Sequence, residues 1–200
     1  MKHIGLTGGI ASGKTTIANM FRYHHIPVFD ADSTVHTLYH QPHVVEKIGA
    51  LFPQAIKDHT VCRRTLSRLL QSSPSSVADL NALIHPIVRQ QERRFKSAHR
   101  ALGTSLIITD IPLMVESKTW SRYDICLMAK APLWLRKQRA FTRSPHMTEA
   151  TWQLITSKQA TDAQRRRHMH GTIYTGLSKA DIMKQVIHWI YTARNQHYGT

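Results

Sequence analysis

The sequence has few cysteines and no long apolar segment. Its two cysteines, Cys62 and Cys126, are far apart along the chain, so no disulfide framework is expected and both thiols should be reduced. No segment approaches the roughly 18 consecutive apolar residues of a membrane-spanning helix, and the apolar residues 3–6 are too few for a signal peptide. These absences favour a cytoplasmic protein that does not associate with membranes.

Acidic residues are also scarce. The 200 residues include 12 Asp and Glu against 27 Lys and Arg, which gives a formal net charge of +15. Such a surface attracts polyanions, but Coulomb attraction does not distinguish nucleic acid from ATP or another polyphosphate. The sequence contains no recognised RNA- or DNA-binding motif. We therefore expect a small-molecule partner, with nucleic acid as a less favoured alternative that the charge does not exclude. The protein is also expected to be a monomer.

Short apolar segments alternate with helix-forming sequence, which predicts a parallel sheet covered by helices. The expected strands are residues 3–6, 26–29, 106–109 and 125–128. No convincing strand lies between residues 32 and 100, where residues 44–52, 64–70, 77–84 and 87–98 are expected to be helical. Serines and a proline predict a loop at residues 71–76. The chain is therefore interpreted as a sheet-containing core with a helical insertion.

Further helices are expected after residue 130. One covers residues 133–141, and a long one begins at the cap residue Thr148 and reaches about Arg167. The last begins at Ser178, which together with Asp181 has the pattern of a capping box. The chain is thus expected to end in a helix that packs its apolar face on the core.

Residues 8–15, Gly-Gly-Ile-Ala-Ser-Gly-Lys-Thr, match the phosphate-binding pattern G-x-x-x-x-G-K-S/T. The pattern predicts a turn between the first strand and a helix, where inward backbone N–H groups and the helix dipole bind a β-phosphate. Lys14 would follow the transferred γ-phosphoryl group, and the Thr15 hydroxyl would bind Mg²⁺. ATP and Mg²⁺ are therefore the expected cofactors, and a purely structural glycine turn is the less favoured alternative.

Charged side chains after the strands supply further candidates. Asp32 follows the second strand and could orient or deprotonate an attacking hydroxyl, and Asp110 ends the third strand, where a carboxylate near magnesium would lie. Structural roles are equal alternatives: a turn at Asp30 with Asp32 as helix cap, and a turn at Asp110. Arg139 and Arg143 could cover a phosphate if their segment is a mobile lid, or they are ordinary surface arginines.

Taken together, the motifs resemble those of the dephospho-coenzyme A kinase family over almost the whole chain. After the phosphate-binding turn come Asp-Ala-Asp at 30–32, Leu-Asn-Ala-Leu-Ile-His-Pro at 80–86 and Pro-Leu-Met-Val-Glu at 112–116. The arginines at 139 and 143 have the spacing of the family's lid, and Gln159 lies where a glutamine is expected. Each later motif is weak alone, but their order and spacing are specific.

The resemblance implies an α/β fold of the P-loop NTPase type, with three layers around a parallel sheet, a helical substrate-binding insertion and a small lid. It assigns residues 1–33 and 101–200 to the nucleotide-binding core, residues 34–100 to the insertion, and about 136–150 to the lid. The implied reaction is phosphorylation by ATP of the 3′-hydroxyl of dephospho-coenzyme A. Alternatives are a P-loop kinase for another nucleoside or small alcohol, or a protein that binds ATP or nucleic acid without transfer.

Carried over by position, the resemblance assigns catalysis to Lys14, to Asp32 as general base and to Arg139 as the clamp on the transition state. The implied nucleotide-binding residues are Gly8, Gly9, Ala11, Ser12, Gly13, Lys14, Thr15, Thr16 and Arg143. The implied substrate-binding residues are Asp32, Arg63, Pro112 and Glu116, and Thr15 is the metal-binding residue.

The chain departs from the family pattern at several positions. Ala11 replaces a glycine, which is expected to require a negative φ at Ala11. Ser144 replaces an acidic residue of the lid. Met169, His170 and Thr175 replace an Ala-Asp pair and an asparagine in a region expected to help hold the adenine.

Overall fold

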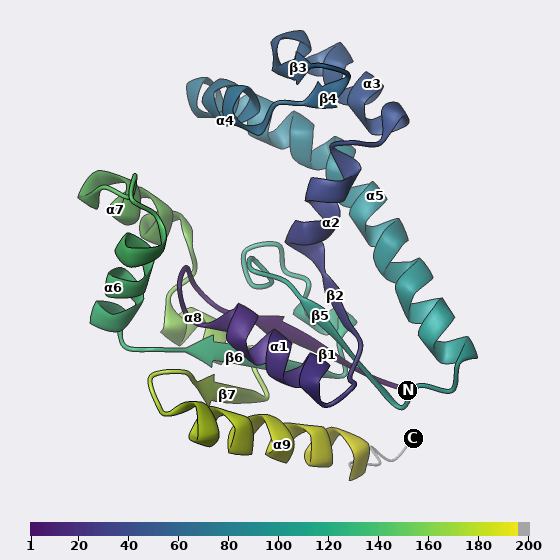
Figure 1. Ribbon diagram of the computed structural model, residues 1–200, viewed down its shortest axis with the longest axis vertical. Helices are drawn as coiled ribbons and strands as arrows, with labels where there is room; N and C mark the ends of the chain where they lie inside the picture. Colours follow the sequence, from purple (N-terminus) through teal and green to yellow (C-terminus); the bar gives the residue numbers. More distant parts are fainter. Residues whose placement is uncertain (196–200) are drawn as a thin grey trace. The chain divides into compact units, whose positions relative to one another are not determined.

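The computed structural model describes residues 1–195, apart from the side chains of Gln71, Ser72 and Pro74. The chain forms two compact units, one from Met1–Phe29 with His99–Thr200 and one from Asp30–Ala98 (Figure 1). The first unit contains most of a parallel sheet, and the second is mainly helical. Asp30 and Asp32 both belong to the second unit.

The main sheet has five strands in the order β2-β5-β1-β6-β7. Their bounds are β1 Lys2–Thr7, β2 Val28–Asp30, β5 Leu106–Asp110, β6 Ile125–Lys130 and β7 Gly171–Tyr174. The pairs β1–β5, β1–β6 and β6–β7 are parallel. The strands β1, β5 and β6 are buried at almost every residue, as expected where helices or loops cover both faces of a sheet. The carboxyl ends of these strands consequently meet at one edge.

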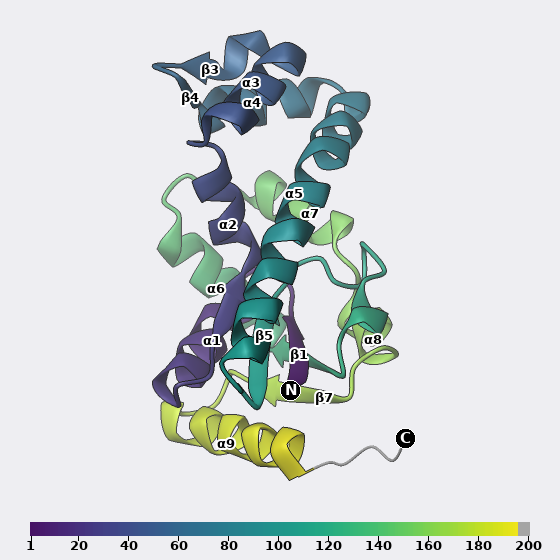
Figure 2. The same cartoon turned by 90° about the vertical axis from the view of Figure 1, so that its right-hand side faces the viewer.

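Helices α1, Lys14–Tyr23, and α9, Lys179–Asn195, lie side by side on one face of this sheet (Figure 2). Ile17 and Phe21 of α1 and Val186 of α9 are fully buried against strand residues such as Ile4 and Leu127. Each such side chain contributes about 2 kcal/mol by leaving water. The other face is covered by Met114 and Tyr123 from the segment after β5, so the expected three-layer α/β fold is confirmed.

The predicted strands are all present, but β7 was not predicted. It has only four residues, begins with a glycine and lies at the edge of the sheet. Three of its residues are partly or fully exposed, so it lacks the apolar run that identified the other strands. Its sequence alone could not distinguish it from a loop.

The expected long helix from Thr148 to about Arg167 is wrong. Helix α6 covers Leu133–Arg143, α7 covers Glu149–Lys158 and α8 covers Asp162–Arg166. Thr148 does cap α7, but the chain then leaves helical geometry until Thr161, which forms a capping box with Gln164. The Thr-x-x-Gln pattern that marks a new helix start is present in the sequence. Ser178 accepts a hydrogen bond from the Asp181 N–H, 3.1 Å away, so the predicted start of α9 is confirmed.

The second unit has its own apolar core, made by Leu38, Val44, Ile48, Phe52, Val61, Leu66, Leu80 and Ile84 with their neighbours. Its elements are α2 Ala31–Leu38, α3 Pro42–Leu51, η1 Pro53–Ala55, β3 Ile56–Lys57, β4 Thr60–Val61, α4 Arg63–Ser72 and α5 Pro74–Ala101. The remaining 3-10 helix, η2, is Trp120–Arg122 in the first unit.

Three expectations for the second unit are corrected. Strands β3 and β4 form a short antiparallel hairpin where no strand was expected, with Asp58 and His59 at positive φ in its turn. Helix α5 continues through Pro86 instead of dividing into two helices, and the expected loop at 71–76 is reduced to the junction around Ser73. Two-residue strands and a helix with an internal proline give no periodic signal that identifies them.

Asp30, not Asp32, caps α2. The Asp30 carboxylate accepts a hydrogen bond of 2.9 Å from the Ser33 N–H, and Asp32 lies in the first turn of the helix.

Within residues 1–195, we find no helix with both the length and the apolarity needed to cross a membrane.

Candidate active site

The predicted phosphate-binding turn joins the carboxyl end of β1 to the first turn of α1. Gly13 caps α1 with a φ of 90°, and a Cβ at this position would lie 2.8 Å from the Thr175 hydroxyl oxygen. Both the backbone conformation and the close approach of Thr175 therefore require glycine here. The first turn of α1 contains no acidic residue, so its positive end is suited to an anion.

Ala11 contradicts the expectation of a negative φ, because its φ is 55°. Ala11 and Gly13 are both left-handed and are separated by Ser12, and such alternation turns successive N–H groups toward a common centre. An alanine in this region costs about 1 kcal/mol. The loop thus keeps the geometry that a glycine would adopt more easily.

The loop also contains a buried donor suited to a phosphate. Ser12 is 2% exposed, and among residues 1–195 its hydroxyl oxygen has no hydrogen-bond partner. Thr15 and Thr16 are exposed in the first turn of α1. An unsatisfied hydroxyl, left-handed turns and an exposed threonine are a donor set that fits the phosphates of MgATP.

Lys14 is held at the carboxyl edge of the sheet by an ion pair. Its Nζ donates to Asp110 Oδ1 over 2.7 Å, and the two side chains are 15% and 7% exposed. The pairing register places Leu6 of β1 opposite Asp110 of β5, so the two adjacent strands bring the loop lysine and this carboxylate together. Asp110 therefore contacts the loop itself, which neither of its expected roles included.

Arg139, expected to act on phosphate, is bound to Thr175. Its guanidinium donates to the Thr175 hydroxyl over 3.1 Å and to the Thr175 carbonyl over 2.7 Å. The same hydroxyl donates to the Ser12 carbonyl over 2.6 Å. Thr175 follows the carboxyl end of β7 and is 1% exposed. It links the loop to the arginine, a role that sequence analysis missed because it treated Thr175 only as a departure.

The other departures near β7 lie at its opposite end. His170 directly precedes β7, and its Nδ1 accepts a hydrogen bond of 2.9 Å from the N–H of Cys126 near the start of β6. His170 is thus at the amino ends of the strands, whereas Thr175 is at the carboxyl edge with the phosphate-binding loop. Of Met169, His170 and Thr175, Thr175 is the residue that is hydrogen-bonded to the loop, through the Ser12 carbonyl.

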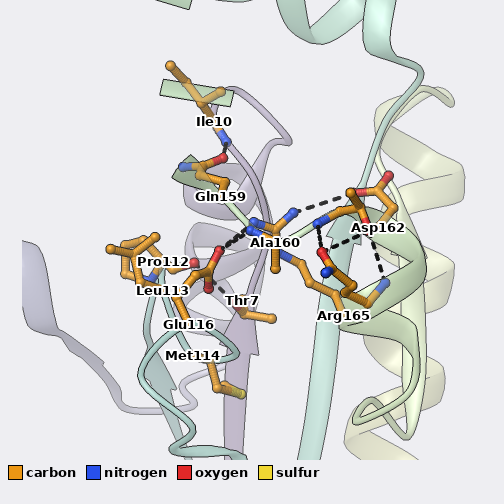
Figure 3. A network of polar contacts seen from close by, with 12 residues as sticks. Thr7, Ile10, Pro112, Leu113, Met114, Glu116, Gln159, Ala160, Asp162 and Arg165 are labelled. Carbon is orange, nitrogen blue, oxygen red and sulfur yellow. Dashed lines mark hydrogen bonds and ion pairs between the residues drawn. The ribbon is translucent and has the colours of Figure 1, made fainter. Parts of the chain in front are cut away.

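The two backbone polar groups of Ile10 are both bound by side chains from later in the chain. The Ile10 N–H donates to Gln159 Oε1 over 2.9 Å (Figure 3), and Arg136 Nε donates to the Ile10 carbonyl over 3.0 Å. Arg136 is 7% exposed. Burial lowers its pKa, the Asp162 carboxylate raises it and Arg165 lowers it further. Neither contact was predicted.

Glu116 organises the segment that carries these groups. Its Oε1 accepts hydrogen bonds from the Ala160 N–H over 2.7 Å and from Arg165 over 3.0 Å (Figure 3). Arg165 is 1% exposed and lies 3.5 Å from Asp162 Oδ1, which is also 3.6 Å from Arg136. The two buried guanidinium groups are thus balanced by two carboxylates. A substrate contact at Glu116 stays a prediction.

The remaining expected residues are separated between the units. The Pro112 carbonyl accepts a hydrogen bond of 3.1 Å from Thr7, beside the loop, and Arg143 is exposed at the end of α6. Asp32 and Arg63 are exposed in the second unit, at the starts of α2 and α4. Their roles toward a substrate stay predictions.

A parallel sheet whose first strand passes through this loop into a helix, with a helical unit inserted after the second strand, defines a P-loop kinase fold. The family model for dephospho-CoA kinase matches residues 2–176. A Bartonella quintana protein named dephospho-CoA kinase is 37% identical over 186 residues, covering 93% of this chain and 95% of that protein. The chain therefore belongs to the dephospho-CoA kinase family, as its motifs suggested.

Solved structures have the same fold. The Thermus thermophilus protein TT1252 superposes with a TM-score of 0.84 at 27% identity, over 98% of each chain. Dephospho-CoA kinase from Campylobacter jejuni superposes with a TM-score of 0.72 at 17% identity, over 95% of this chain and 96% of that one. The second likeness supports the fold only.

Proposed function

We propose that the chain transfers the γ-phosphoryl group of ATP to the 3′-hydroxyl of dephospho-coenzyme A, the last step of coenzyme A synthesis. The observation that carries the proposal is the loop of residues 8–15, in which Lys14 is fixed at the sheet edge and the buried Ser12 hydroxyl has no hydrogen-bond partner within the described part of the chain. Membership of the family supports this acceptor.

In the proposed reaction, the acceptor oxygen forms a bond to the γ-phosphorus while the bond to the β,γ-bridging oxygen breaks and ADP leaves. Asp32 takes the hydroxyl proton. Lys14 has three N–H donors, so it can bind phosphate oxygens while it keeps its bond to Asp110. Thr15, exposed in the first turn of α1, is the residue proposed to hold Mg²⁺. An ion bound there with the nucleotide would supply positive charge that offsets the charge of the phosphates.

Arg139 and Arg143 are proposed to stabilise negative charge on the transferred group. Arg139 is fixed by two bonds to Thr175, so its guanidinium is oriented before the nucleotide binds. Arg63, Pro112 and Glu116 are proposed to contact the acceptor. A cytoplasmic location and a monomeric state also stay predictions.

The deciding experiment is formation of coenzyme A from dephospho-coenzyme A and MgATP by the purified chain, with Lys14→Met as the inactive control. Adenosine and shikimate, tested as acceptors in parallel, address the alternative of another nucleoside or small alcohol. Faster formation of ADP with either of these acceptors than with dephospho-coenzyme A would refute the proposed acceptor.

The net charge of +15 keeps a nucleic-acid partner as the second candidate. Binding of this kind weakens steeply as salt rises. A titration with duplex and single-stranded DNA at two salt concentrations tests it, and the absence of tight, salt-dependent binding would end that interpretation.

A further inference from the structure

The peptide unit between Ile10 and Ala11 has an unusual combination of features. Ala11 has a left-handed φ of 55° although it carries a Cβ. The carbonyl of the same peptide unit, that of Ile10, accepts a hydrogen bond of 3.0 Å from Arg136 Nε. The strained residue and the buried arginine therefore meet at one peptide group.

The geometry of a trans peptide links these two features. The C=O and N–H of one peptide unit point in opposite directions, so a carbonyl held by Arg136 directs the Ala11 N–H away from Arg136. Rotation of this peptide would bring Ala11 to the negative φ that alanine prefers, and it would also reverse the Ala11 N–H. Alanine thus favours the rotated form, and the bond from Arg136 opposes it.

We propose that Arg136 is a positioning residue that compensates for the alanine at position 11. By fixing the Ile10 carbonyl, it keeps the Ala11 N–H directed into the loop, where a nucleotide phosphate binds. The inference rests on the proposed nucleotide-binding function of this loop. A glycine at position 11 would need no such support, because glycine adopts positive φ at little cost.

The surroundings of Arg136 are suited to this role. A Cβ on Gly9 would lie 2.2 Å from one guanidinium nitrogen, so only glycine allows the arginine so close to the loop. Asp162 lies 3.6 Å from Arg136 and is itself near Arg165. Gln159 holds the preceding peptide through the Ile10 N–H. Two consecutive peptide units of the loop are therefore fixed from outside the loop.

The test is a double-mutant cycle of Arg136→Met and Ala11→Gly, read as the dissociation constant for ADP by calorimetry. We expect Arg136→Met to weaken ADP binding about fivefold more when residue 11 is alanine than when it is glycine, the factor that the preference of alanine against left-handed φ supplies. Lys137→Met is the matched control, because Lys137 lies in the same helix as Arg136 and its exposed ammonium group pairs with Glu149 of α7. We expect it to leave ADP affinity unchanged.

A direct contact between Arg136 and phosphate would give a different result. The loss of ADP affinity would then be equal in the two backgrounds, and this outcome would overturn the proposal. If Arg136→Met does not fold, Arg136→Lys replaces it in the cycle, because lysine keeps the charge and lacks the Nε–H. Wild-type chain that bound no ADP would refute the proposed function, whereas equal losses would refute only the role of Arg136.

Discussion

Lys14 Nζ and Asp110 Oδ1 lie 2.7 Å apart, at the carboxyl ends of two adjacent strands. Both side chains are largely removed from water, so each charge depends on a partner. The lysine of the phosphate-binding loop is thereby held in place by the sheet itself. Asp110 consequently affects both the stability of the fold and the position of the Lys14 ammonium group, for which we propose a catalytic role.

Removing one member of this pair should destabilise the protein. Asp110→Ala leaves the Lys14 ammonium group without this partner, and we expect unfolding to cost about 3 kcal/mol less, with Tm lower by roughly 6–12 °C. Thermal unfolding followed by circular dichroism measures the change. In the double variant Lys14→Met/Asp110→Leu, most of the lost stability should return. If the double variant instead lost as much stability as the two substitutions lose separately when added together, the two side chains would not be energetically coupled.

Asp32→Asn should reduce turnover without a comparable change in nucleotide binding. An amide cannot accept the hydroxyl proton, so we expect kcat to fall by at least ~10² while the dissociation constant for ADP is retained. Steady-state kinetics and calorimetry measure the two quantities. Glu46→Gln, which neutralises another exposed carboxylate of the second unit, is the control. Undiminished turnover in Asp32→Asn would remove Asp32 from the mechanism.

Thr175→Val tests the link between the loop and Arg139. Valine keeps the shape but leaves the Ser12 carbonyl without the 2.6 Å bond from Thr175. We expect a loss of about 2 kcal/mol of stability, a Tm lower by roughly 4–8 °C, and weaker ADP binding. Thr175→Ser should retain both properties, and Thr172→Val in the preceding strand β7 is the control. A Thr175→Val variant with wild-type stability and affinity would contradict the assigned link.

The two thiols should differ in reactivity. A hydrogen bond from Thr65 lowers the pKa of Cys62, whereas burial raises the pKa of Cys126 to about 11. Because the thiolate is the reactive form, we expect Ellman's reagent at pH 8 to modify one thiol in the native protein and both after denaturation. Cys62→Ser should abolish the native reaction. If both thiols of the native protein reacted with Ellman's reagent at the same rate, this assignment would be contradicted.

The parts of the fold predicted correctly are those in which the signal is contiguous. Residues 8–15 carry the whole phosphate-binding pattern in one segment, and the buried strands are short apolar runs. The edge strand β7 lacks such a run. The break before Thr161 was missed because one long helix was predicted from Thr148 to about Arg167, although the capping pattern at Thr161 marks the start of a new helix. Local patterns identify elements well only when the element is buried or capped distinctly.

The contacts around the loop could not have been predicted. Arg136 and Ile10 are 126 positions apart, and Arg165 and Glu116 are 49 apart. Nothing in a single sequence specifies which arginine meets which carbonyl, because the pairing arises from the packing of α6 and α8 against the loop. For the same reason, the positive φ of Ala11 was unforeseen: its support comes from a residue far along the chain.

Arg136 and Gln159 are both hydrogen-bonded to the backbone of Ile10. The segment between them contains most of α6 and all of α7, so both of its ends are held at the same residue of the loop. These two contacts fix the ends of the segment. We therefore expect that insertions, deletions or substitutions within residues 144–147, between the two helices, alter the middle of the segment while the loop of residues 8–15 keeps its shape. We accordingly expect that residues 144–147 can be varied in evolution and in protein engineering without a change in the loop of residues 8–15.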